Sequence, residues 1–100
     1  MNTLEQVSFK TQGYQIVNIT QNIQELIHRH GFEKGLVNLS ILHTSASLTI
    51  QENASKDVLT DIRTFLSSLA PESLNYLHNA EGPDDMPAHL KTLITNTNLT

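Results

Sequence analysis

Hydrophobic and polar residues alternate near the start of the chain, over 6–10. Val7 and Phe9 share one face of 6–10, which is typical of a half-buried strand. The segment 14–19 is rich in isoleucine, valine and tyrosine, and Gly13 marks a turn before it. The pattern therefore predicts an N-terminal β-hairpin.

The spacing of apolar residues then becomes helical. A cap at Thr20 or Asn22 opens a helix with one apolar face, and Gly31 follows where a helix end favours a left-handed residue. A longer apolar stripe begins after Ser55, a good N-cap residue, and ends before Pro71. Two main helices are expected.

Short elements complete the chain. Alternating patterns over 35–42 and 46–50 predict two more strands, and 89–95 predicts a short third helix. Residues 98–100 resemble the start of a strand, and because no segment follows them we expect another chain, or further polypeptide, to complete the sheet. This order predicts one α+β domain over 1–100 with mostly antiparallel strands.

The composition of the chain argues against several classes of function. A net charge of −4 with six Lys and Arg residues argues against a broad nucleic-acid-binding face. The absence of cysteine excludes disulfides, thiolate zinc sites and a cysteine nucleophile. No apolar run approaches the roughly 20 residues of a membrane helix, and the N-terminus lacks the pattern of a signal peptide. We expect a cytoplasmic protein that binds neither nucleic acid nor membrane.

The segment 76–89 holds most of the candidate chemistry. It contains two histidines and three carboxylates, namely His78, Glu81, Asp84, Asp85 and His89. His89 is expected near a helix N-terminus, where the partial positive charge disfavours imidazolium and leaves the neutral ring that binds metal. The acidic residues are candidate ligands, or partners that fix the tautomer of a histidine ring.

His43 is the long-range candidate, because it follows an apolar strand whose rigid end could hold a ligand. Nitrogen and oxygen donors without sulfur suit Zn²⁺, Mn²⁺, Fe²⁺ or Ni²⁺. The residues alone leave alternatives open: His43 as a hydrogen-bonded structural residue, and the acidic turn as capping and solvation. His28 and His30 are interpreted as structural, because a cation near a helix C-terminus is favourable. Glu52-Asn53 is interpreted as capping, with a polar contribution to the site as the alternative.

Several segments of the chain form a recognisable set of motifs. They are His43-Thr44-Ser45-Ala46-Ser47-Leu48-Thr49, Gln51-Glu52-Asn53, Asp57-Val58 with Asp61, Tyr76-x-His78, and Glu81-Gly82-x-Asp84-Asp85-Met86-Pro87-Ala88-His89. Together they resemble one known family, the YjbQ-like proteins, also described as secondary thiamine-phosphate synthases. The resemblance covers essentially the whole chain, and the string at 84–89 is its most specific part.

The resemblance implies a sandwich-like sheet, a homotrimer and a site for a divalent metal ion, zinc or similar. It implies the metal ligands His43, His78 and His89, with Glu81, Asp84 and Asp85 beside them as catalytic candidates. Family members usually continue with further strands, so we expect a domain that is C-terminally incomplete relative to the family.

The implied activity is weak thiamine-phosphate synthesis, which joins a pyrimidine diphosphate to a thiazole phosphate. A divalent metal would offset charge on the departing diphosphate. Two alternatives remain open. One is a metal-binding trimer without a dedicated catalytic role, and the other is a metal-assisted hydrolase with Glu81 or Asp84 as the base.

Overall fold

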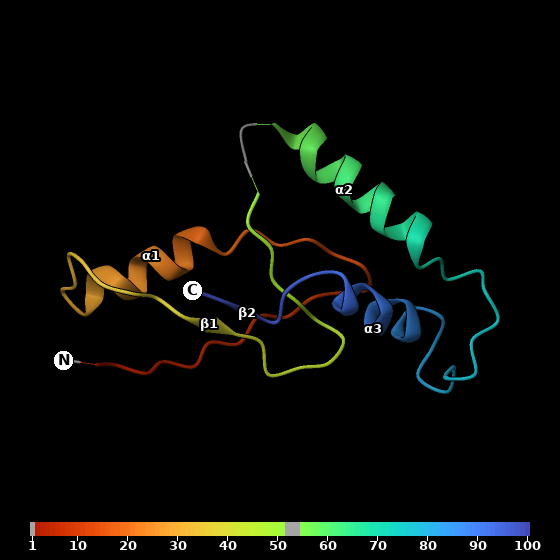
Figure 1. Cartoon of the computed structure of the whole chain (residues 1–100), viewed down its shortest axis with the longest axis horizontal. Coiled ribbons are helices and arrows are strands. Elements are labelled where there is room, and N and C mark those ends of the chain that lie inside the picture. Colours follow the sequence, from red (N-terminus) through yellow and green to blue (C-terminus); the bar gives the residue numbers. More distant parts are fainter. Residues whose placement is uncertain (1, 52–54) are drawn as a thin grey trace.

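The computed structural model describes residues 2–51 and 55–100, which form three helices and a small antiparallel sheet (Figure 1). The helices are α1 (Thr20–Arg29), α2 (Lys56–Leu69) and α3 (Asp85–Leu93), and the strands are β1 (Leu39–Ser40) and β2 (Asn98–Leu99). The predicted α+β class, with antiparallel pairing, two main helices and a short third, is confirmed.

The two main helices begin in different ways. Ser55 caps α2 as predicted, because its hydroxyl accepts the backbone N–H of Asp57 at 3.2 Å. In α1 the cap position falls on Ile19, which offers no side-chain hydrogen bond, so the predicted caps Thr20 and Asn22 lie inside the helix.

Gly31 ends α1 as predicted, with a positive φ of 73°. Its N–H donates to the carbonyl of His28 at 3.0 Å, and the N–H of Phe32 donates to the carbonyl of Ile27 at 3.4 Å. These two bonds define a Schellman motif, which satisfies carbonyls that a helix end would otherwise leave unpaired.

The sheet joins the end of the chain to its middle. β2 pairs antiparallel with β1 in the register Leu39 to Leu99 and Ser40 to Asn98. The contact continues through the N–H of Ile41, which donates to the carbonyl of Thr97 at 2.8 Å, and through a bridge between Leu48 and Asn96. The partner of the last strand therefore precedes it within the same chain.

The predicted N-terminal hairpin does not form, since 6–10 and 14–19 carry no strand pairing. The turn is present, with Gly13 at a φ of 56°, but the second arm packs elsewhere. The hydroxyl of Tyr14 donates to the carbonyl of Arg63 at 3.3 Å, and its ring lies 3.6 Å from Nζ of Lys91. These contacts hold Tyr14 against α2 and α3. The strands predicted over 35–42 and 46–50 shrink to β1 and one bridge, because among the described residues they pair only with the short segment 96–99.

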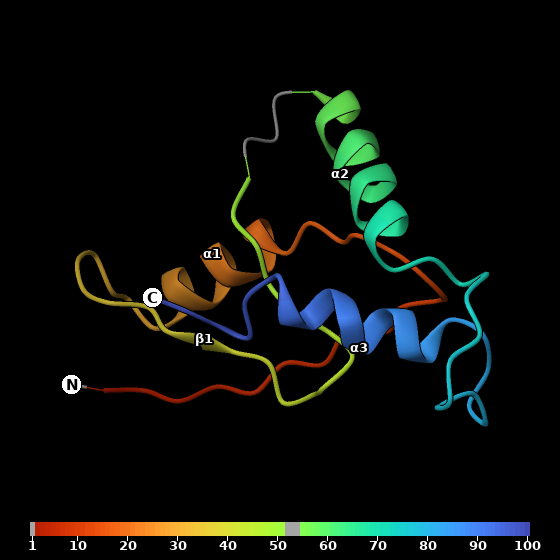
Figure 2. The same ribbon diagram turned by 45° about the vertical axis from the view of Figure 1, so that its right-hand side comes forward.

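The chain is open rather than closely packed. α2 stands away from the sheet in both views (Figures 1 and 2). The radius of gyration is 15.7 Å, against about 13 Å for a compact domain of this length. The accessible surface is 8351 Å², against about 5,700 Å² for a folded monomer of this mass. Among the described residues only Ala70 and Pro87 are buried, so much apolar surface is exposed.

In the described part of the chain, no helix is both long enough and apolar enough to cross a membrane.

Candidate metal centre

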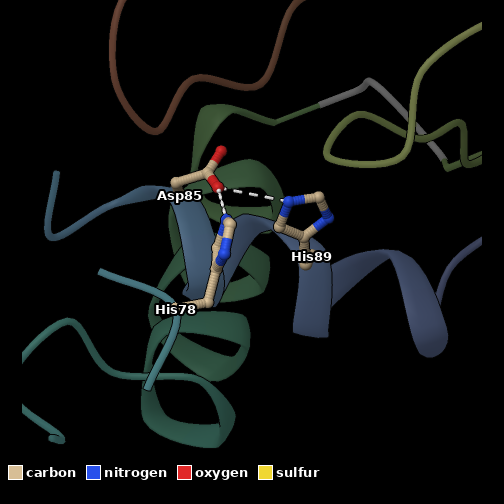
Figure 3. A group of neighbouring side chains, drawn as sticks. All are labelled: His78, Asp85 and His89. Carbon is tan, nitrogen blue, oxygen red and sulfur yellow. Dashed lines mark hydrogen bonds and ion pairs between the residues drawn. The ribbon is translucent and has the colours of Figure 1, made fainter. Parts of the chain in front are cut away.

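Two side chains of the candidate site share one face of α3. Asp85 and His89 are four residues apart, so they lie one above the other along the helix. The loop that leaves α2 returns His78 to the same place (Figure 3). One carboxylate oxygen, Oδ2 of Asp85, then lies 2.7 Å from Nε2 of His78 and 3.2 Å from Nε2 of His89.

The second ring nitrogen of His89 fixes its hydrogen-bonding state. Nδ1 lies 3.0 Å from the backbone carbonyl of Thr44, which can only accept, so Nδ1 carries the proton. In a neutral ring Nε2 would then direct its lone pair at the carboxylate of Asp85. Two acceptors that face each other at 3.2 Å need a proton or a cation between them, which is a second proton on the ring or a metal cation at Nε2.

The carboxylate of Asp85 is suited to stabilise a positive charge at Nε2 of His89. The hydrogen bond with His78 lowers the pKa of the Asp85 carboxyl below its ordinary value. Desolvation opposes this shift, while the charges of His89 and His78 lower the pKa further. The group therefore remains a carboxylate over a wider pH range and supplies the negative charge at the centre of the cluster.

The donor set fits a divalent metal. The donor atoms of His78, Asp85 and His89 all lie within 4.8 Å of one another. Ligands about 2.0–2.2 Å from a tetrahedral zinc are separated by roughly 3.3–3.6 Å, so the two contacts at 2.7 and 3.2 Å need only a small widening. The set of two imidazoles and one carboxylate also leaves a coordination position for a substrate.

The other predicted site residues lie around this cluster. Glu81 is exposed beside Asp85. Asp84 occupies the N-cap of α3 and accepts the N–H of Ala88 through its backbone carbonyl at 3.1 Å, while its side chain makes no cap hydrogen bond. Glu52 and Asn53 lie outside the described residues. His30, at the end of α1, pairs with Glu5 at 2.8 Å.

His43 does not join the metal-ligand group that the described residues form. Its Nδ1 lies 3.0 Å from the backbone nitrogen of Ser45 and 2.9 Å from the hydroxyl of the same residue. His43 nevertheless lines the same surface depression as His89, together with Thr44 and Met86. The structure thus brings His43 close to the cluster without placing its ring nitrogens in it.

Two features of the site escaped the sequence analysis. Asp85 is the centre of the cluster, a role hidden by the expected helix start at position 89; a start at 85 would have placed Asp85 and His89 on one face. The second is the carbonyl of Thr44, and no residue type signals a backbone acceptor.

Fold and site together define a small α+β protein with a histidine–aspartate cluster at the start of its last helix. The chain belongs to the family described as UPF0047 protein YjbQ-like, whose model matches residues 5–100.

Named relatives agree with this assignment. A UPF0047 protein from Synechocystis sp. is 47% identical over 88 residues, which are 87% of this chain and 60% of that protein. The UPF0047 protein YjbQ of Escherichia coli O157:H7 is 37% identical over 93% of this chain and 67% of its own length. A crystal structure of a YjbQ/UPF0047 family protein from Clostridium acetobutylicum matches with a TM-score of 0.74 and 29% identity, over 85% of this chain and 64% of that one. The chain thus spans roughly two thirds of these relatives.

Proposed function

We propose that His78, Asp85 and His89 bind one divalent metal ion, zinc or a similar one. The observation that carries this proposal is the position of His89, whose two ring nitrogens both face oxygen acceptors. A second proton resolves that conflict in the metal-free ring, and a metal ion bound between Nε2 and the Asp85 carboxylate would take the place of that proton. The carbonyl of Thr44 keeps the proton on Nδ1, which leaves the lone pair of Nε2 for the metal.

We propose further that this site supports a thiamine-phosphate synthase-like transfer, in which a pyrimidine diphosphate and a thiazole phosphate are joined and pyrophosphate leaves. The bound metal would supply positive charge to the departing diphosphate. In a chain of net charge −4 with six Lys and Arg residues, such a metal is the most effective way to offset an anionic substrate.

The chain's own residues would prepare the site. In the metal-free site Asp85 holds the two imidazoles together, and the hydrogen bond with His78 lowers the pKa of its carboxyl, so that the carboxylate is ready when a metal replaces the proton. Glu81, exposed beside Asp85, is positioned to accept a proton. Asp84, at the N-cap of α3, adds a carboxylate next to Asp85 that makes no cap hydrogen bond.

Release of pyrophosphate from the two thiamine precursors tests this function. Zinc- or manganese-loaded protein should release it, His89→Ala should not, and His28→Ala on α1 should behave as the wild type. Loaded protein that releases none would refute the synthase. A panel of phosphate esters and amides then separates the hydrolase, with Glu81 as the base on water, from a metal-binding protein without turnover.

We also propose a homotrimer. The chain exposes 8351 Å², which is about 2,700 Å² more than a compact monomer of its mass. Each protomer of a cyclic trimer makes two interfaces, and two of standard size bury about 1,600 Å² per protomer. The exposed side chains of Leu36, Leu42, Ile50 and Leu77 supply apolar surface for such contacts. Sedimentation equilibrium should give three times the chain mass, and a monomer at all concentrations would refute the trimer.

A further inference from the structure

The hydrogen bonds of His43 assign the proton on its ring. The backbone N–H of Ser45 can only donate, and its nitrogen lies 3.0 Å from Nδ1 of His43. Nδ1 is therefore the acceptor, and the hydroxyl of Ser45 lies 2.9 Å from the same atom. A neutral imidazole with an unprotonated Nδ1 carries its proton on Nε2.

This state is the opposite of that of His89. The carbonyl of Thr44 keeps a proton on Nδ1 of His89 and leaves Nε2 with a lone pair. In His43 the lone pair on Nδ1 is engaged by Ser45, and Nε2 presents an N–H. A metal ligand needs a free lone pair, so His43 in this arrangement is a hydrogen-bond donor and not a ligand.

The depression that contains both histidines shows what this donor would meet. Its walls are mostly apolar and include Ile41, Met86, Leu90 and Leu93. The carbonyl of Thr44, which also lines it, already accepts from His89 and from the hydroxyl of Thr92. His43 is exposed, and both of its side-chain hydrogen bonds in the described part of the chain are at Nδ1, so its Nε2–H can donate to an oxygen of a bound molecule in place of water.

We propose that His43 donates from Nε2 to an anionic phosphoryl oxygen of a substrate held at the metal. The proposal rests on the metal site described above and adds the ligand class that His43 recognises. Ser45 is a positioning residue, because its backbone N–H holds the ring in the donor state. The Ser45 hydroxyl is secondary, since the backbone bond remains without it.

Amide substitutions test the assignment. In His43→Gln the side-chain amide reaches the region of Nε2, whereas in His43→Asn it reaches only the region of Nδ1. Zinc content after desalting and the affinity of zinc-loaded protein for inorganic phosphate, by calorimetry, are the two measurements. His28→Ala is the control, and circular dichroism checks folding.

We expect His43→Ala, His43→Asn and His43→Gln to keep one zinc ion per chain. Phosphate affinity should fall about tenfold or more in the alanine and asparagine variants, as for a lost hydrogen bond to a charged group, and recover in the glutamine variant. Ser45→Ala should bind phosphate almost as the wild type does.

Two results would overturn the inference while leaving the metal site intact. One is loss of zinc in His43→Ala as complete as in His89→Ala, which would make His43 a ligand. The other is phosphate affinity that is unchanged in His43→Ala or not restored by glutamine. A wild-type protein that takes up no zinc would refute the metal site itself, and this inference with it.

Discussion

His89 donates a hydrogen bond from Nδ1 to the backbone carbonyl of Thr44, 3.0 Å away and 45 residues earlier in the chain. The bond links α3 to the segment after β1 and fixes the orientation of the ring. Partners of this kind commonly contribute tenfold or more to metal affinity.

A substitution at Thr92 tests the link between His89 and Thr44. The hydroxyl of Thr92 lies 3.2 Å from the carbonyl oxygen of Thr44 and 2.6 Å from the carbonyl oxygen of His89. Thr92→Val should weaken zinc binding by less than the roughly tenfold expected for loss of a direct partner of a ligand, because it removes a second donor to the Thr44 carbonyl and leaves the bond from His89 in place. Thr64→Val is a matched control, since Thr64 bonds only within α2. Competition with a chromophoric chelator measures both, and equal loss in the two variants would contradict the role of Thr92.

Loss of a ligand should have a larger effect. His78→Ala, Asp85→Ala and His89→Ala should each lower zinc affinity by more than the roughly 10–100-fold that partners beyond the ligands contribute. His28→Ala, on α1, should leave affinity unchanged. Elemental analysis of untagged protein gives the stoichiometry, and retention of zinc by all three variants would refute the cluster as the site.

The metal-free protein should lose stability in acid through Asp85. The hydrogen bond with His78 lowers the pKa of this carboxyl below 3.8, so the folded state favours the ionised form. The stabilisation is present above the unfolded pKa and disappears as the pH falls through the lower folded value. In urea unfolding with a chelator present, the free energy of unfolding should therefore fall more steeply with decreasing pH for the wild type than for Asp85→Asn. Parallel curves of this free energy against pH would contradict the role of Asp85.

Gly31→Ala should destabilise the end of α1. With φ at 73° the residue is in the left-handed region, where a side chain costs roughly 1 kcal/mol. Gly35→Ala is the matched control, because both glycines have open space around an added Cβ and only Gly31 has a positive φ. Urea unfolding should show a lower midpoint for Gly31→Ala alone.

Assembly should raise thermal stability. A chain with only Ala70 and Pro87 buried among its described residues has little core of its own. If other copies cover its apolar surface, the Tm rises with protein concentration, because association stabilises the folded state relative to the unfolded state. A Tm that is constant over a hundredfold dilution series would count against the trimer.

The sequence predicted those parts of the fold that depend on local chemistry. Ser55 and Gly31 mark helix ends because a hydroxyl and a left-handed residue act on the backbone beside them. The hairpin failed because alternation shows which side chains share a face and not what they pack against. Tyr14 packs against Arg63 and Lys91, both far along the chain.

The candidate site shows the same difference between features set by local sequence and features set by distant contacts. The motif at 78–89 predicted the two histidines and, among its acidic candidates, the one carboxylate that the structure brings together with them, Asp85. The placement of His43 depends on its bonds with Ser45, a local turn that residue types alone do not reveal. The sequence prediction of His43 as a metal ligand is untested, and its bonds with Ser45 support the donor role proposed above.

The pairing of Leu39 with Leu99 also constrains how the molecule folds. β1 leaves the ribosome about 60 residues before its partner, so its edge stays open during much of synthesis. Closing a loop of that length is entropically costly and slow compared with forming α1 or α2. The contact of His89 with Thr44 spans a similar separation in sequence, so the metal-binding geometry should be among the last features to form. Zinc present during refolding should therefore affect only a step that follows the formation of the helices.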